Sequence, residues 1–132
     1  DNNGTYVDYL KQDKKNNCSR IVDKSDPESK RAELEYKVLD CIQTEEKDPQ
    51  YLSLVEIKLL TGRHHQIRVQ FSGHGTPLYG DGKYGNNEKA VRKSLALCAC
   101  HLKFKHPATG KIMDFQIKPD TGAFKLFSKS ND

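Results

Sequence analysis

The chain has 132 residues, of which 30% are charged and 35% hydrophobic, and its formal net charge at pH 7 is +4. This length suits one domain with one modest core. No stretch approaches the roughly 18–20 apolar residues of a membrane-spanning helix, and the N-terminus lacks the basic and then apolar pattern of a signal peptide. The small positive charge permits a polyanionic partner without requiring one, because it also favours solubility.

The four cysteines are scattered along the chain, and only Cys98 and Cys100 lie close together. A single residue separates these two, whereas zinc-binding pairs usually have two to four intervening residues. We therefore interpret all four cysteines as free thiols of a reducing compartment. We expect a cytoplasmic protein without a metal site.

The chain begins with a polar stretch, residues 1–17, in which only residues 8–10 (DYL) offer an anchor to a core. Residues 19–22 are typical of a short edge strand. Residues 26–29 (DPES) indicate a turn, because proline and short polar side chains favour turns.

Alternation of apolar and charged side chains predicts two longer strands. Residues 32–38 (AELEYKV) show this pattern, which is typical of a half-buried strand. Residues 52–60 (LSLVEIKLL) repeat it, with Val55, Ile57 and Leu59 on one face. A charged loop joins the two strands, so we expect them to be antiparallel neighbours.

A short helix is predicted over residues 63–71, directly after the second of these strands. Thr61 is the N-cap candidate, because its hydroxyl can accept a hydrogen bond from a free backbone N–H. Gly73 and Gly75 supply the stop.

The spacing of the side chains orients this predicted helix. Ile67 and Phe71 lie four residues apart and are expected to face the core. Arg68 lies three and four residues after His65 and His64, which places all three on one side of the helix.

The second half of the chain predicts a hairpin between less regular segments. On the first strand of the hairpin, one face is expected to carry Cys98, Cys100, Leu102 and Phe104. On the second strand, Met113, Phe115 and Ile117 are expected to point inward. The segments are a turn-rich loop over 78–85, a loop or exposed helical turn over 86–93, strands over 95–105 and 111–117 joined by 106–110, and a short helix over 124–127. The predicted fold is α+β, mainly an antiparallel or mixed β-sheet, with one short functional helix after the central strand.

Polar residues crowd the start of the predicted helix, in the segment 61–68 (TGRHHQIR). Cations, imidazoles and an amide make a poor core but suit a surface that faces an anion. The glycine-dense segment 75–85 (GTPLYGDGKYG) follows, and glycine lets the backbone come close to a ligand.

Three ordered blocks resemble the RluA-type family of RNA pseudouridine synthases. They are LTGRxHQIR at 60–68, GxPxxGDxxYG at 75–85 and LxAxxLxFxHP at 97–107. The resemblance covers nearly the whole chain, because residues 8–10, Asn17 and the strand over 30–36 fit the same pattern. Gln70, where relatives often have histidine, and Cys98, where Leu-His-Ala is usual, depart from it.

The resemblance implies that the catalytic residues lie upstream of this chain. The family carries its catalytic aspartate in an Arg-Leu-Asp…Thr-Ser-Gly stretch and an active-site tyrosine between that stretch and the matched region. Neither element is in this sequence, and Asp8 and Asp81 lie in other contexts. We expect residues 1–132 to be the C-terminal portion of a single catalytic domain, inactive alone, in which Asp81 caps its loop.

The family isomerises uridine to pseudouridine in RNA, and the resemblance implies a catalytic carboxylate with no cofactor and no metal. By its position in the motif, Arg68 is the candidate partner of the absent aspartate. A guanidinium offers a permanent charge and a fixed fork that keep a carboxylate ionised. The alternative is that Arg68 bridges a local acid such as Glu56.

The candidate RNA-binding residues are Arg63, His65, Lys83 and Tyr84, and the expected partner is ribosomal or transfer RNA. Arg63 and His65 at the helix start suit a phosphate, although a solvated first turn or a structural His65 fits equally well. Lys83 either widens a phosphate-binding surface or is merely solvated, and Tyr84 either packs or stacks on a base. His64 is expected to be exposed and incidental.

Two other classes of function compete with the enzyme. One is a non-catalytic RNA-binding module that keeps the scaffold without the aspartate, and the other is a small interaction domain whose motif is coincidental. An Arg-Leu-Asp sequence encoded upstream of Asp1 would favour the enzyme.

Overall fold

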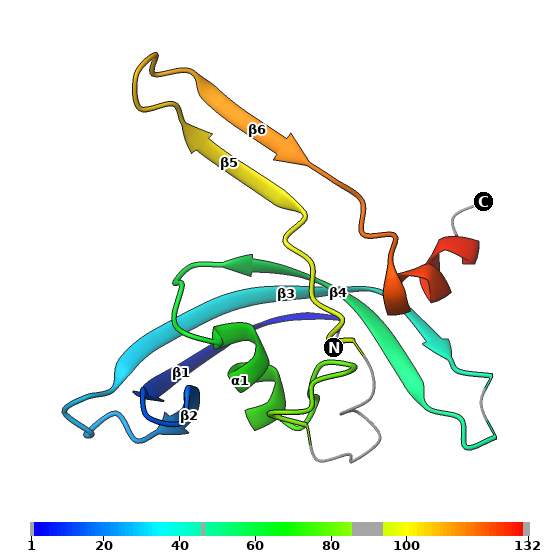
Figure 1. Ribbon diagram of the computed structural model, residues 1–132, viewed down its shortest axis with the longest axis horizontal. Coiled ribbons are helices and arrows are strands. Elements are labelled where there is room, and N and C mark those ends of the chain that lie inside the picture. Colours follow the sequence, from blue (N-terminus) through cyan, green and yellow to red (C-terminus); the bar gives the residue numbers. More distant parts are fainter. Residues whose placement is uncertain (1, 46, 86–93, 131–132) are drawn as a thin grey trace. The chain divides into compact units, whose positions relative to one another are not determined.

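The computed structural model in Figure 1 describes residues 2–45, 47–85 and 94–130. The chain divides into two compact units, Asp1–Leu95 and Ala96–Asp132. The expectation that both belong to a single catalytic domain stays a prediction.

The first unit is a four-stranded antiparallel sheet with one helix packed against it. The strand order is β2-β1-β3-β4, and the helix α1 contacts β1 and β2 (Figure 1). The elements are β1 (Asn3–Asp13), β2 (Cys18–Val22), β3 (Lys30–Gln43), β4 (Tyr51–Leu59) and α1 (Gln66–Gly73).

The alternation of residues 32–38 is confirmed in β3. Ala32 and Leu34 are fully buried, and the charged residues between them point outward or are partly covered. β3 pairs with β4 in antiparallel register, as predicted, with a bulge between Val38 and Asp40. Leu59, at the end of β4, is 48% exposed. The predicted apolar face of that strand therefore ends at Ile57.

The strand β1 contradicts the expectation of a polar stretch with a single anchor, because it lies between β2 and β3. Its polar residues have partners on α1. Asp8 accepts hydrogen bonds from Gln70 Nε2 and His74 Nε2, each at 2.9 Å, and the Tyr6 ring stacks on His74 with centroids 3.9 Å apart. Hydrophobic periodicity does not detect a strand whose inner face is satisfied by hydrogen bonds.

The core of this unit forms where α1 meets the sheet. Leu10, Ala32 and Val69 make the buried cluster, and Tyr84 packs against it. Phe71 is buried as predicted, whereas Ile67 is only partly covered. The face that α1 presents to the sheet is therefore centred on Gln66, Val69 and Gln70, with Ile67 at its margin.

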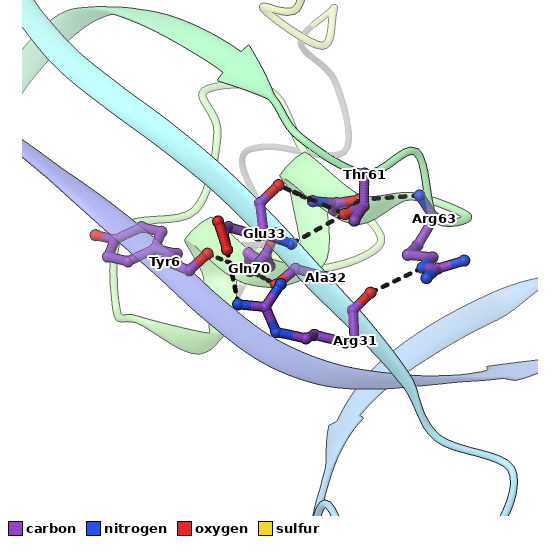
Figure 2. A network of polar contacts seen from close by, with 8 residues as sticks. Tyr6, Arg31, Ala32, Glu33, Thr61, Arg63 and Gln70 are labelled. Carbon is purple, nitrogen blue, oxygen red and sulfur yellow. Dashed lines mark hydrogen bonds and ion pairs between the residues drawn. The ribbon is translucent and has the colours of Figure 1, made fainter.

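Gln70 is also fully buried on this face. Its Nε2 lies 3.3 Å from the Ala32 carbonyl oxygen and 3.4 Å from that of Tyr6 (Figure 2). Its Oε1 has no hydrogen-bond partner among the described residues. The buried side chain thus packs without satisfying both ends of the amide.

The second unit contains an antiparallel hairpin of β5 (His101–Lys105) and β6 (Ile112–Gln116), followed by the 3-10 helix η2 (Gly122–Ser130). The connection over 106–110 is confirmed, and the Gly110 N–H donates to the His106 carbonyl oxygen at 2.9 Å. The predicted helix over 124–127 is the 3-10 helix.

Two expectations for this hairpin are wrong. The strand begins at His101, so Cys98 and Cys100 precede it. Phe115 and Ile117 are 53% and 64% exposed rather than inward, in a sheet that has two strands within the described residues. The expectations for residues 86–93 fall outside the described residues.

The predicted fold class is confirmed: the described residues combine antiparallel sheets with a short helix after β4. No helix in the described ranges is long and apolar enough to cross a membrane.

Candidate functional site

The side chain of Gln66 fixes the turn between β4 and α1. It is 3% exposed. Its Oε1 accepts hydrogen bonds from the Thr61 hydroxyl at 2.8 Å and the Arg63 N–H at 2.9 Å, and its Nε2 donates to the Glu33 carbonyl oxygen at 3.1 Å. Figure 2 shows the residues of β3 and of this turn in one network. The turn is therefore held against the middle of the sheet.

Contrary to the prediction, Thr61 does not cap the helix. Its hydroxyl accepts from the Glu33 N–H at 2.9 Å, and so extends the pairing of β3 beyond the end of β4. His65 occupies the N-cap position with φ 52° and without a side-chain cap. This left-handed residue starts α1 at Gln66 rather than at residue 63 and places His64 and His65 outside the helix.

Arg68 and Asp81 form a bidentate ion pair at the centre of the site. Arg68 Nε donates to Asp81 Oδ2 at 3.0 Å, and Arg68 Nη2 donates to Asp81 Oδ1 at 2.8 Å. The Asp81 side chain is fully buried, and that of Arg68 is 19% exposed. Arg68 does have a local acid as its partner, but the acid is Asp81 and not Glu56.

Asp81 also caps its own loop, as expected. Its Oδ1 accepts hydrogen bonds from the backbone N–H groups of Lys83 and Tyr84, each at 3.1 Å. Burial opposes the charge, but the Arg68 guanidinium and these two N–H groups outweigh it and hold the pKa of Asp81 below its usual value. The same carboxylate raises the pKa of Arg68. Both groups are therefore charged at neutral pH.

Gly80 allows the loop to bring Asp81 beneath the helix. Its φ is +80°, a region that side chains disfavour. A Cβ built there would lie 2.1 Å from the Ser94 carbonyl oxygen. A glycine is required here for both conformation and space.

Tyr84 contacts both Arg68 and His65. The Arg68 guanidinium lies 5.0 Å from the centre of the Tyr84 ring. The Tyr84 hydroxyl accepts a hydrogen bond from the Ser19 N–H at 3.0 Å and lies 2.7 Å from His65 Nδ1. The contact with His65 ties this histidine to the loop that carries Asp81.

His64 is not incidental, contrary to expectation. Its Nδ1 lies 2.8 Å from the Ser19 hydroxyl and its Nε2 lies 3.1 Å from Asn17 Oδ1. Its ring stacks on that of His65 with centroids 3.8 Å apart. The Lys83 ammonium donates to the Asn17 carbonyl oxygen. The turn between β1 and β2 is thus bound to the site at two points.

Four of the five predicted site residues are brought together: Arg68 pairs with Asp81, and His65, Lys83 and Tyr84 lie beside this pair. Arg63 binds elsewhere, because its Nε donates to the Arg31 carbonyl oxygen at 2.9 Å (Figure 2). Sequence reasoning missed Ser19 and the ion-pairing role of Asp81. The glycines on either side of Asp81 were the available signal for a loop that approaches the helix.

The site carries a pH-dependent contribution to stability. Burial, and then the positive charges of His64, Arg68 and Lys83, lower the pKa of His65 below its ordinary value. The unfolded chain therefore takes up a proton at about pH 6.5, where folded His65 still resists it. We expect the free energy of unfolding to fall as the pH drops below that point and to level off beneath the folded pKa.

Denaturant unfolding between about pH 8 and pH 5 measures this dependence. In His65→Gln, the free energy of unfolding should depend less steeply on pH in this range, because the glutamine does not titrate. An equal slope in both proteins would contradict the assignment to His65.

The sequence was also compared with known proteins. A sequence model of the RNA pseudouridylate synthase family matches residues 1–73. The chain belongs to this family. The matched region contains β1 to α1 and therefore Arg63, His65 and Arg68, whereas Asp81, Lys83 and Tyr84 follow it.

Several curated relatives of the RluA type are similar. The chain is 40% identical over 103 residues to an uncharacterized RNA pseudouridine synthase of Aquifex aeolicus, covering 71% of this chain and 31% of the relative. It is 37% identical over 110 residues to ribosomal large subunit pseudouridine synthase D of Zymomonas mobilis, covering 77% and 32%. It is 35% identical over 92 residues to the dual-specificity RNA pseudouridine synthase RluA of Yersinia pestis, covering 69% and 42%.

The fold has a counterpart among solved structures. Human RNA pseudouridylate synthase domain containing 1 superimposes with a TM-score of 0.72 at 22% identity, covering 91% of this chain and 49% of that chain. The chain thus spans about a third of the first two curated relatives and about half of the human chain.

Proposed function

We propose that this chain is the C-terminal portion of the catalytic domain of an enzyme that isomerises uridine to pseudouridine in RNA. The observation that carries the proposal is the partly buried Arg68 guanidinium, held by the fully buried Asp81, in a chain of the RNA pseudouridylate synthase family. In the reaction the glycosidic bond breaks, the uracil turns, and its C5 bonds to the sugar. No atom is gained or lost overall, and the resemblance to the family implies a catalytic carboxylate with no cofactor and no metal.

In this proposal Arg68 is the partner of a catalytic aspartate that lies outside the chain. A carboxylate beneath a flipped base would be costly to bury without a cation. An adjacent guanidinium lowers the pKa of an aspartate by roughly 1–3 units, which keeps it ionised at neutral pH. The Arg68–Asp81 pair supports this role, because it holds the guanidinium in one orientation.

The proposed RNA contacts are His65, Lys83 and Tyr84 beside the Arg68–Asp81 pair, and Arg63 at the turn bound to β3. Uridine stacked in a helix is inaccessible, so it must be turned outward at a cost of a few kcal/mol. Cationic side chains offset part of that cost through contacts with phosphates, which makes binding sensitive to salt. Arg63 is exposed and binds protein through its Nε, which leaves its outer nitrogens for a phosphate.

The proposed substrates are ribosomal or transfer RNA in the cytoplasm. The names of the Zymomonas and Yersinia relatives support this class, since one is a ribosomal large subunit enzyme and the other is a dual-specificity RNA enzyme.

The test uses the intact protein, with the residues upstream of Asp1, and transcribed ribosomal and transfer RNAs. We expect pseudouridine at one or a few uridines, detected by chemical mapping and by mass spectrometry of nucleosides. Salt-sensitive binding without product in every RNA would instead favour the non-catalytic RNA-binding module.

A further inference from the structure

The guanidinium of Arg68 is bound along one edge. Arginine has five N–H donors, arranged as a side edge of Nε and one Nη and an end edge of the two Nη atoms. Asp81 takes the side edge through Nε and Nη2. Within residues 2–45, 47–85 and 94–130, no hydrogen bond or ion pair involves Nη1.

The orientation of this group is fixed from two directions. Asp81 is buried and held by two backbone N–H groups as well as by Arg68. The Tyr84 ring lies 5.0 Å from the guanidinium carbon, and the Tyr84 hydroxyl is in turn bound to Ser19 and His65. The side edge is thus anchored, while the Arg68 side chain as a whole stays 19% exposed.

We infer that Asp81 is a positioning residue. It binds the side edge of the Arg68 guanidinium (Nε and Nη2) and so orients the end edge (Nη1 and Nη2) toward the catalytic carboxylate, which is supplied from outside this chain. One guanidinium would then serve two carboxylates at once. This inference rests on the proposed function and adds to it the role of a residue in the loop after α1.

The arrangement has an electrostatic consequence. A guanidinium that already neutralises Asp81 attracts a second carboxylate less strongly than an unshared one does. The catalytic carboxylate therefore retains more affinity for a proton than it would beside a free arginine, which suits a group that acts as a nucleophile or a base. Asp81 thereby sets both the direction of the fork and the strength of its field.

Other charged and titratable groups lie near the pair. Lys83 and Tyr84 interact with it directly, Cys18 lies beside Tyr84, and His64 lies beside His65. Burial and neighbouring charges lower the pKa of His65 below its ordinary value, so its titration falls on the acidic side of neutral pH and the experiment must separate its proton from that of the carboxylate.

The test is Asp81→Asn in the intact protein. Asparagine keeps an acceptor for the loop N–H groups but removes the charge and one acceptor for Arg68. We expect kcat to fall about ten- to a hundredfold, as when an outer partner of a functional side chain is lost, with little change in KM. We also expect the acidic limb of the pH profile of kcat/KM to move to lower pH, because the catalytic carboxylate then has the whole guanidinium charge.

The shift of the acidic limb caused by Asp81→Asn is measured again in a His65→Gln background, which removes the titration of His65. Asp26→Asn is the matched control, because it removes an aspartate that pairs with Lys11 of β1 and forms no hydrogen bond or ion pair with the described residues of the site. It should leave rate and profile unchanged. A fall in rate at an unmoved acidic limb would reduce Asp81 to a purely structural residue and overturn the inference.

A structure of the intact wild-type protein tests the same point without any variant, should Asp81→Asn not fold. Two carboxylates on the Arg68 guanidinium, with Asp81 on Nε, are expected. An Arg68 that has released Asp81 would overturn the inference while leaving the proposed function in place. Failure of the wild-type protein to form pseudouridine would instead remove the proposed function.

Discussion

Replacing Arg68 by alanine in the intact protein is expected to abolish pseudouridine formation. The change removes the proposed partner of the catalytic aspartate. It also leaves the fully buried Asp81 carboxylate without its cation, and the loss of one member of a buried pair costs about 3–5 kcal/mol of stability. Product formation and thermal unfolding, measured on the same preparation, report the two effects.

Conservative and paired variants separate catalysis from folding. Arg68→Lys should fold but retain little activity, because lysine keeps the charge and loses the planar fork. Adding Asp81→Asn to Arg68→Ala should recover part of the lost stability without activity, since no unpaired carboxylate remains. Arg20→Ala, an exposed arginine on β2, is the control. A near-normal rate for Arg68→Ala would remove Arg68 from the mechanism.

The 132-residue chain alone is expected to convert no uridine in any RNA. In the proposed mechanism the nucleophilic or basic carboxylate and the active-site tyrosine both lie upstream. The chain supplies only the cation that would hold the carboxylate. Incubation with transcribed RNA, followed by pseudouridine mapping, measures the outcome, and the intact protein serves as the positive control.

Weak RNA binding by this chain would agree with that expectation, provided that it declines as salt is raised. Any turnover by the chain alone would refute it and would require a catalytic group within residues 1–132.

The sequence predicted the parts of the fold whose side chains alternate simply. Residues 32–38 and 52–60 became β3 and β4 because one face of each carries the apolar residues that the sheet covers. The turn at 26–29 also formed, and the Ser29 N–H donates to the Asp26 carbonyl oxygen at 3.0 Å. These features depend on local pattern and local hydrogen bonds, which a single sequence displays.

The missed features depend on partners that are distant in the chain. β1 looked like a polar segment because Asp8 finds Gln70 and His74, more than sixty residues away. The start of α1 was misplaced because His65 adopts a left-handed conformation. Helix propensity and capping patterns do not anticipate a backbone angle that the surrounding contacts impose.

The candidate site was predicted in composition rather than in geometry. The motif placed Arg68 at its centre, and the glycines indicated a loop close to a functional surface. The bidentate geometry with Asp81 requires the loop to fold back across thirteen positions, which spacing alone does not establish. The catalytic role of Arg68 and the RNA contacts of Arg63, His65, Lys83 and Tyr84 stay predictions.

The attachment of Asn17 to His64 and Lys83 restricts how the β1–β2 turn can vary in length. An added residue between Asp13 and Cys18 would shift the register of Asn17 and break both attachments together, because one side chain and its own backbone make them. Natural insertions and engineered tags should therefore be tolerated better in the β3–β4 connection, where Thr44 and Gln50 hydrogen-bond to each other rather than to the candidate site.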